Sequence, residues 1–126
     1  MVKNSIFNNN HATNSPGGAI FFSSESAVQN CAFKDNTAQM GDAILFSKNG
    51  TVEDSNFTNN NATISGGAIF SWNGGIVKNA LFANNNALNA LGGAIYFGGS
   101  GLTVENSDFY NNKANSPGEQ FIPVET

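Results

Sequence analysis

The chain has no arginine and few charged side chains of any kind. Charged residues make up 11% of its 126 residues, and its net charge is −4. Because nucleic-acid binding requires a basic face, this composition excludes a nucleic acid as partner. Without arginine, bidentate recognition of phosphate or carboxylate groups by a guanidinium is excluded as well.

Cysteine and long apolar runs are equally scarce. The single cysteine, Cys31, excludes an internal disulfide. We expect it to be a small buried residue, because equivalent positions of the repeat described below hold serine or alanine. No apolar run approaches the ~20 residues of a membrane span, so we expect no membrane insertion within this segment. The sequence opens without a signal peptide, and we expect an excerpt of a longer repeat protein.

The sequence does contain a repeat of about 25 residues that recurs five times. Each copy holds a valine, then a phenylalanine, an asparagine and an alanine at fixed spacing. The block Gly-Gly-Ala-Ile follows in three copies, Gly-Asp-Ala-Ile in the second copy and Gly-Glu-Gln-Phe in the fifth. The copies span residues 1–24, 25–50, 51–74, 75–97 and 98–126. The phenylalanine column is Phe7, Phe33, Phe57, Phe82 and Phe109, and the asparagine column is Asn10, Asn36, Asn60, Asn85 and Asn112. Length differences between copies fall almost wholly between the alanine and the first glycine, a segment that we call the tolerant loop.

The local pattern predicts strands. Each copy consists of short segments interrupted by Asn, Gly and Ser, and none has the apolar periodicity of a helix. We predict three short strands per copy, with equivalent strands of successive copies stacked in parallel at about 4.8 Å. The expected fold is therefore an all-β single domain, a right-handed single-stranded parallel β-helix of about five rungs.

Each column then has a structural role. The phenylalanines are expected to stack in the core. We expect the asparagine column to mark a turn in the left-handed conformation, with side-chain amides bonded from rung to rung. The position two after the valine should behave likewise; it holds Asn4, Asn30, Asp54, Asn79 and Asn106. The position one after the valine should be a solvated charged column of Lys3, Gln29, Glu53, Lys78 and Glu105.

The strand containing Gly-Gly-Ala-Ile has apolar residues on both faces. We expect its isoleucines to point inward together with Phe22, Phe46 and Phe97, although the opposite orientation also fits the pattern. The alternate residues and a nearby tryptophan form a candidate binding strip of Phe21, Leu45, Phe70, Trp72 and Tyr96. An exposed strip would predict a partner or glycan surface, whereas a buried strip would support only a stalk.

Catalytic residues are not apparent. Parallel β-helix enzymes that cleave polysaccharides use arginine or lysine with bound calcium, or clustered carboxylates. Here the aspartates fall in different columns of the repeat: Asp35, Asp42, Asp54 and Asp108. The only histidine, His11, lies in a predicted turn. We therefore expect no enzyme, no catalytic residue, no cofactor and no metal.

The two motifs together resemble a known kind of surface repeat. Five copies of Phe-x-x-Asn with interleaved Gly-Gly-Ala-Ile resemble the repeats of chlamydial polymorphic outer membrane proteins. The asparagine-rich repeat sequence, as in residues 30–38 and 61–70, is also similar to that of adhesin-like surface proteins of methanogenic archaea. The resemblance implies an extracellular, cell-surface location and attachment to surface glycans or proteins of another cell, with neighbouring repeats of the same protein as further contacts. The alternatives are a purely structural stalk or spacer and a fragment of a carbohydrate-active β-helix enzyme.

Overall fold

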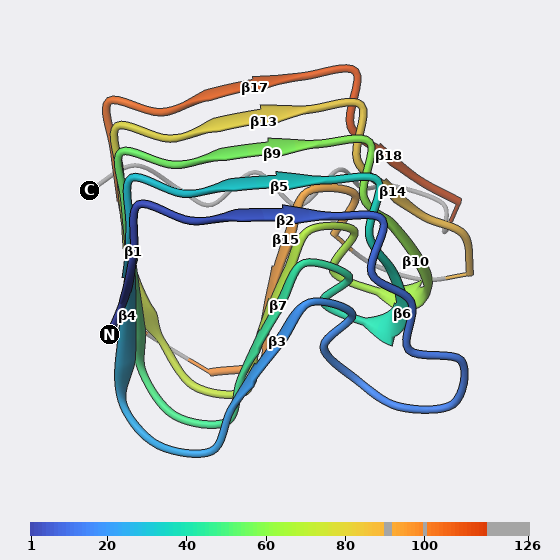
Figure 1. Cartoon of the computed structure of the whole chain (residues 1–126), viewed down its shortest axis with the longest axis horizontal. Coiled ribbons are helices and arrows are strands. Elements are labelled where there is room, and N and C mark those ends of the chain that lie inside the picture. Colours follow the sequence, from blue (N-terminus) through green and yellow to red (C-terminus); the bar gives the residue numbers. More distant parts are fainter. Residues whose placement is uncertain (90–91, 100, 116–126) are drawn as a thin grey trace.

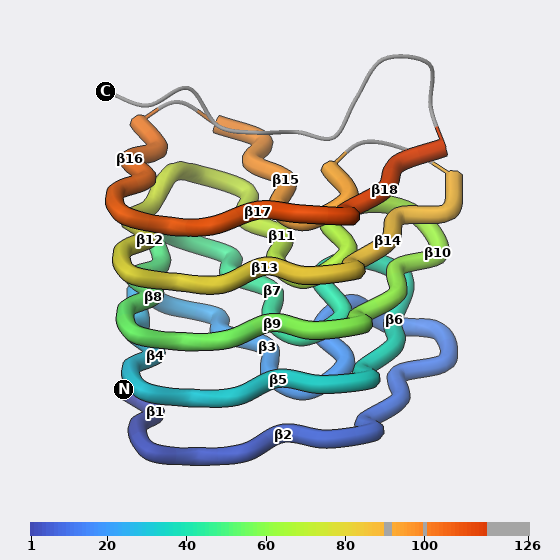
Figure 2. Tube along the Cα trace, turned by 90° about the horizontal axis from the view of Figure 1, so that it is seen from above, coloured from blue at the N-terminus to red at the C-terminus, as the bar shows by residue number. Residues whose placement is uncertain are grey.

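The computed structural model describes residues 1–89, 92–99 and 101–115, and shows a stack of parallel strands wound as a solenoid. The chain climbs from the N-terminal rung to the C-terminal rung in a right-handed sense (Figure 2). The predicted parallel β-helix is therefore confirmed. Of the predicted fifth copy, 98–126, residue 100 and residues 116–126 lie outside the described residues. Within the described part of the chain, no helix is long and apolar enough to span a membrane.

Four parallel sheets run along the stack, and we name each after its recurring residue. The valine sheet contains β1 (Val2–Lys3), β4 (Ser26–Gln29), β8 (Gly50–Glu53), β12 (Gly75–Lys78) and β16 (Leu102–Glu105). The phenylalanine sheet contains β2 (Ile6–Asn8), β5 (Ala32–Lys34), β9 (Asn56–Thr58), β13 (Leu81–Ala83) and β17 (Asp108–Tyr110). The alanine sheet contains β6 (Thr37–Met40), β10 (Asn61–Ser65), β14 (Asn86–Ala87) and β18 (Lys113–Ala114). The isoleucine sheet contains β3 (Ile20–Phe22), β7 (Ile44–Phe46), β11 (Ile69–Ser71) and β15 (Ile95–Phe97).

The alanine sheet is the element that the sequence pattern did not predict. Three strands per copy were expected, and the structure has a fourth at the start of the tolerant loop. Its strands are short and polar, and two of them have only two residues, so they carry almost no periodic signal. Their partners lie one whole copy away in the sequence, as in the pairing of Ala62 with Ala87.

Three of the four sheets enclose the apolar core. Looking down the stack, Figure 1 shows the phenylalanine sheet along the top, the valine sheet down the left and the isoleucine sheet slanting back beneath them. The buried core cluster draws its side chains from these sheets and the corners next to them. Strands β6, β10, β14 and β18 contribute none of its members. The alanine sheet and the tolerant loops therefore form a side lobe on the isoleucine sheet.

The phenylalanine column forms a continuous stack, as predicted. Adjacent ring centroids along the column are 4.7–4.9 Å apart and the rings are within 5° of parallel. The strand spacing imposes this distance, since equivalent residues of neighbouring parallel strands lie about 4.8 Å apart. Burying each ring contributes roughly 1.5–3 kcal/mol, and the stack fixes the position of each rung on the next.

The two glycines of Gly-Gly-Ala-Ile are required for different reasons. The first has a positive φ, +67° at Gly66, which non-glycine residues adopt at a cost. The second lies against the backbone of the next rung: a Cβ on Gly67 would come within 2.0 Å of the Gly93 carbonyl oxygen and 2.8 Å of the Asn86 nitrogen. The two glycines therefore allow the start of the isoleucine strand to lie directly against the backbone of the alanine sheet.

Candidate functional site

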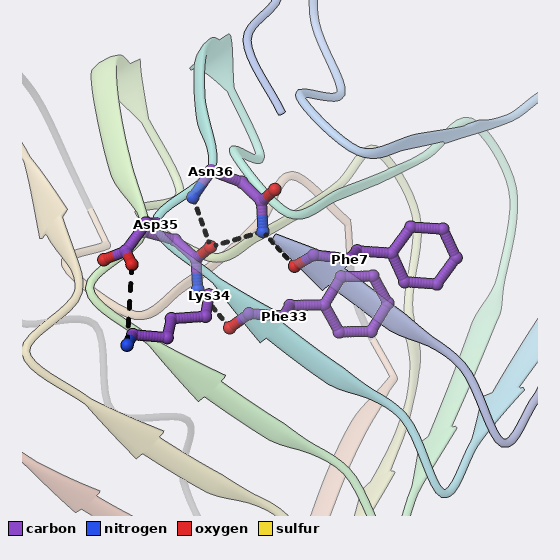
Figure 3. Close-up of polar contacts among 6 residues, drawn as sticks. Phe7, Phe33, Lys34, Asp35 and Asn36 are labelled. Atoms are coloured by element: carbon purple, nitrogen blue, oxygen red, sulfur yellow. Dashed lines mark hydrogen bonds and ion pairs between the residues drawn. The ribbon is translucent and has the colours of Figure 1, made fainter. Parts of the chain in front are cut away.

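The asparagine column forms a buried hydrogen-bonded ladder. The side-chain Nδ2 of Asn36 donates to the Oδ1 of Asn60 at 2.9 Å. The same Nδ2 donates to the Phe7 carbonyl oxygen of the preceding rung at 3.1 Å (Figure 3). The backbone N–H of Asn36 donates to the same Oδ1 at 3.1 Å. The pattern recurs from rung to rung through Asn85 and Asn112. Only an amide of this length supplies both the donors and the acceptor, which explains why the column does not vary.

The left-handed conformation lies one residue earlier than predicted. In each copy the residue before the ladder asparagine has positive φ, and none of the ladder residues does. These left-handed residues are Asn9, Asp35, Asn59, Asn84 and Asn111. The earlier column was predicted correctly, because Asn4, Asn30, Asp54, Asn79 and Asn106 have φ between 46° and 53°. The rung-to-rung bonds predicted for the amides of the invariant asparagine are present, and only the predicted left-handed turn is wrong for this column, because it lies at the preceding residue.

The isoleucines point into the core, as predicted. Ile44, Ile69 and Ile95 are fully buried there, and Phe22 and Phe97 pack against the same cluster. The other face of the isoleucine sheet carries the candidate binding strip. Figure 1 places β6 and β10 on this side of the sheet, away from the core.

In the structure, the candidate binding strip consists of buried residues and accessible residues. Leu45 and Phe70 are buried outside the main core cluster, at 0% and 2% exposure. Phe21 and Trp72 are each 51% exposed, and Tyr96 is half-buried. Phe70 stacks on Tyr96 with centroids 5.0 Å apart, and Trp72 meets Phe70 edge-on at 4.7 Å. The accessible part of the strip is therefore a pair of aromatic side chains over a buried Phe70, with Phe21 separate at the first rung.

The remaining polar columns largely follow the sequence pattern. In the charged column, Lys78 forms an ion pair with Glu105 at 3.3 Å, and Gln29 donates to Glu53 at 3.4 Å. Cys31 is buried, as expected. Its backbone N–H donates to Ser55 Oγ, so the cysteine occupies a corner at which serine hydroxyls otherwise bond between rungs.

Asp42 is a buried carboxyl group in a position where three other copies have glycine. The backbone N–H of Ala38 donates to its Oδ1, while its Oδ2 has no hydrogen-bond partner among the described residues. Burial raises the pKa of Asp42 to about 9, with the Ala38 hydrogen bond opposing that rise. In the next rung, β10 departs from regular register with β6 between Ala62 and Ser65. Within residues 1–89, 92–99 and 101–115, no three His, Cys, Asp or Glu side chains gather as metal ligands would.

The fold, the ladder and the paired motifs define a β-solenoid repeat segment. Residues 4–23 and 54–71 match the family model of the Chlamydia polymorphic membrane protein repeat. These two stretches bear out the resemblance to the chlamydial polymorphic membrane protein repeat that the Phe-x-x-Asn and Gly-Gly-Ala-Ile motifs predicted. The copy that holds Asp42 lies outside both matched stretches. No curated protein and no solved structure matches the chain significantly. The resemblance to archaeal adhesin-like proteins stays a prediction.

Proposed function

We propose that this chain is the repeat segment of a cell-surface protein that attaches to surface glycans or proteins of another cell. The repeat family and the β-solenoid fit a repeat segment of a surface protein. The observation that supports attachment is the half-exposed Trp72, held edge-on against the buried ring of Phe70. A rigid aromatic side chain that is already ordered before binding gives contact area at low entropic cost.

The accessible aromatic surface is small, and this determines what it binds. Trp72 and Tyr96 lie on neighbouring rungs beside the same Phe70 ring. A pair of aromatic rings on a polar surface provides stacking faces for a sugar ring or an aromatic side chain. We therefore expect weak individual contacts that gain strength when many repeats act together.

A structural stalk is the second candidate, and one observation favours it. Leu45 and Phe70, the middle of the strip, are buried, so most of this apolar column stabilises the side lobe. The two functions differ in a simple respect: a stalk tolerates loss of Trp72 without loss of attachment.

The test is adhesion of beads coated with the purified chain to a panel of cultured cells. The informative variant is Trp72→Ser, since serine follows the isoleucine strand at the equivalent positions Ser23 and Ser47. The matched control is Ile76→Thr on the valine sheet, an exposed apolar residue that pairs in register with Thr51. We expect bead binding to fall at least about fivefold for Trp72→Ser, in line with the loss of one aromatic contact. Unchanged binding for Trp72→Ser, or an equal loss for the control, would leave the stalk as the function of this segment.

A further inference from the structure

A polar surface, distinct from the aromatic strip, lies on the outside of the asparagine ladder. Here the chain leaves the phenylalanine sheet and enters the alanine sheet, and the last two rungs border a hollow of about 500 Å³. Its lining residues are Asn84, Asn85, Asn86, Asn111 and Lys113. The hollow is thus lined by amides and one ammonium group, with no aromatic ring.

The backbone around the hollow is fixed before any ligand arrives. Asn84 and Asn111 hold left-handed turns at φ of 56° and 53°. Between them, the Asn85 backbone N–H donates into the ladder at 3.0 Å, and its carbonyl oxygen accepts from Lys113 N–H at 2.8 Å. Asn86 and Lys113 are register partners on β14 and β18. The side chains therefore project from a rigid frame, which lowers the entropic cost of binding.

The polar groups of this hollow are not engaged in the described part of the chain. The side chains of Asn84, Asn86 and Asn111 form none of its hydrogen bonds, and Lys113 belongs to neither of its ion pairs. The other asparagine corner differs, because there the amides bond one another, as Asn30 does to Asn4 at 2.8 Å. The hollow therefore presents three amides with donors and acceptors, and one cation, to the solvent.

From this arrangement we propose that the hollow binds an acidic oligosaccharide. Amides offer paired donors and acceptors to sugar hydroxyls, and the Lys113 ammonium supplies a charge-assisted bond to one carboxylate. The single cation and the net charge of −4 disfavour extended polyanions such as nucleic acids. The site rests on the proposed attachment function for its biological role, but it uses different residues from the aromatic strip.

The test is an NMR titration of the ¹⁵N-labelled chain with a tetrasaccharide of alternating glucuronic acid and N-acetylglucosamine. Chitotetraose serves as the uncharged probe. We expect saturable shifts of the side-chain amides of Asn84, Asn86 and Asn111, and weaker binding of chitotetraose. Lys113→Thr introduces threonine, the residue that Thr37 provides at the equivalent position of β6. This variant should bind the acidic probe about fivefold more weakly. The control is Lys34→Thr, which removes an exposed lysine from β5 and inserts its register partner from β9, Thr58.

Three results would overturn the proposal. They are the absence of saturable shifts at these amides, an equal loss of affinity in Lys34→Thr, and equal binding of the charged and uncharged probes. Trp72→Ser in the same titration separates this site from the aromatic strip, because it should leave the affinity unchanged. If bead attachment depends on Trp72 while the acidic probe fails to bind, only the hollow is refuted. If the probe binds while Trp72→Ser beads adhere normally, only the role of the strip is refuted.

Discussion

The ladder corner is the turn with the asparagine ladder, where the chain passes from the phenylalanine sheet to the alanine sheet. It differs from the side lobe in how strictly its sequence and geometry repeat from rung to rung. At the ladder corner, every copy has the same phenylalanine and the same asparagine, which is buried in all copies but the first, and the ring spacings vary by only 0.2 Å. In the side lobe, the tolerant loop changes length, Asp42 replaces a glycine, and β10 bulges against β6. The difference shows that rung register is set at the corner, by rings and amides that must meet identical neighbours. The lobe is free to vary because the strands of its alanine sheet contribute no side chain to the buried core cluster.

Breaking the ladder in the middle should have the largest effect on stability. Asn60 accepts from the N–H and Nδ2 of Asn36 at 3.1 and 2.9 Å, and donates to Phe33 O at 3.2 Å and Asn85 Oδ1 at 3.0 Å. Asn60→Ala removes these four hydrogen bonds and leaves the buried Asn36 N–H unpaired, at about 1–3 kcal/mol for that donor and about 0.5–1.5 kcal/mol for each of the other bonds. Asn36 Nδ2 keeps the Phe7 carbonyl oxygen as a partner, and Asn85 Oδ1 keeps the Asn60 N–H. We expect a loss of about 4 kcal/mol or more, measured by urea unfolding. That is a large part of the stability of a domain of this size.

The first rung provides the matched control for that substitution. The Asn10 side chain donates to Asn36 Oδ1 at 2.9 Å and accepts no hydrogen bond from the described residues. Asn10→Ala should therefore cost only about 1 kcal/mol. Equal losses for the two alanine variants would contradict the ladder as the element that sets the register.

The second prediction concerns pH and the buried carboxyl of the lobe. The pKa of Asp42 rises from 3.8 to about 9 on folding, so the folded chain holds a proton that the unfolded chain releases. The stability is therefore full below pH 3.8 and decreases as pH rises towards 9, by up to about 1.4 kcal/mol per pH unit. We expect a loss of about 2–4 kcal/mol between pH 4 and pH 7.

Asp42→Asn removes this ionisation while keeping an oxygen that can accept from the Ala38 N–H. Urea unfolding at pH 4, 5.5, 7 and 8.5 should show a sloping profile for the wild type and a flatter one for the variant. Parallel profiles would mean that the carboxyl reaches water in the folded chain.

Much of this architecture could be predicted from the repeat, and the failures have physical causes. The stacking of Phe57 on its neighbours and the inward orientation of Ile69 follow from period and hydrophobicity. The alanine sheet was missed, because strands such as Asn86–Ala87 are held by neighbouring rungs rather than by their own composition. The hollow could not be predicted for a different reason. Asn84 and Asn85 are adjacent residues of the same type, and only the structure shows that Asn85 is buried in the ladder while Asn84 is exposed.

The smallest expected effect tests why the lobe tolerates Asp42 at all. At the equivalent glycine of the next rung, Gly67→Ala would place a Cβ 2.0 Å from the Gly93 carbonyl oxygen, and backbone must shift to relieve the overlap. We expect a loss of about 1–3 kcal/mol in urea unfolding, the usual cost of overpacking. Gly98→Ala is the control, because its Cβ would meet nothing closer than the Trp72 carbonyl oxygen at 3.2 Å, a contact that a shift of a few tenths of an ångström relieves, and its cost should be well below that at Gly67. A negligible cost at Gly67 would mean that the lobe adjusts in every rung. A cost confined to Gly67 would indicate that the bulge in β10 is what makes room for Asp42.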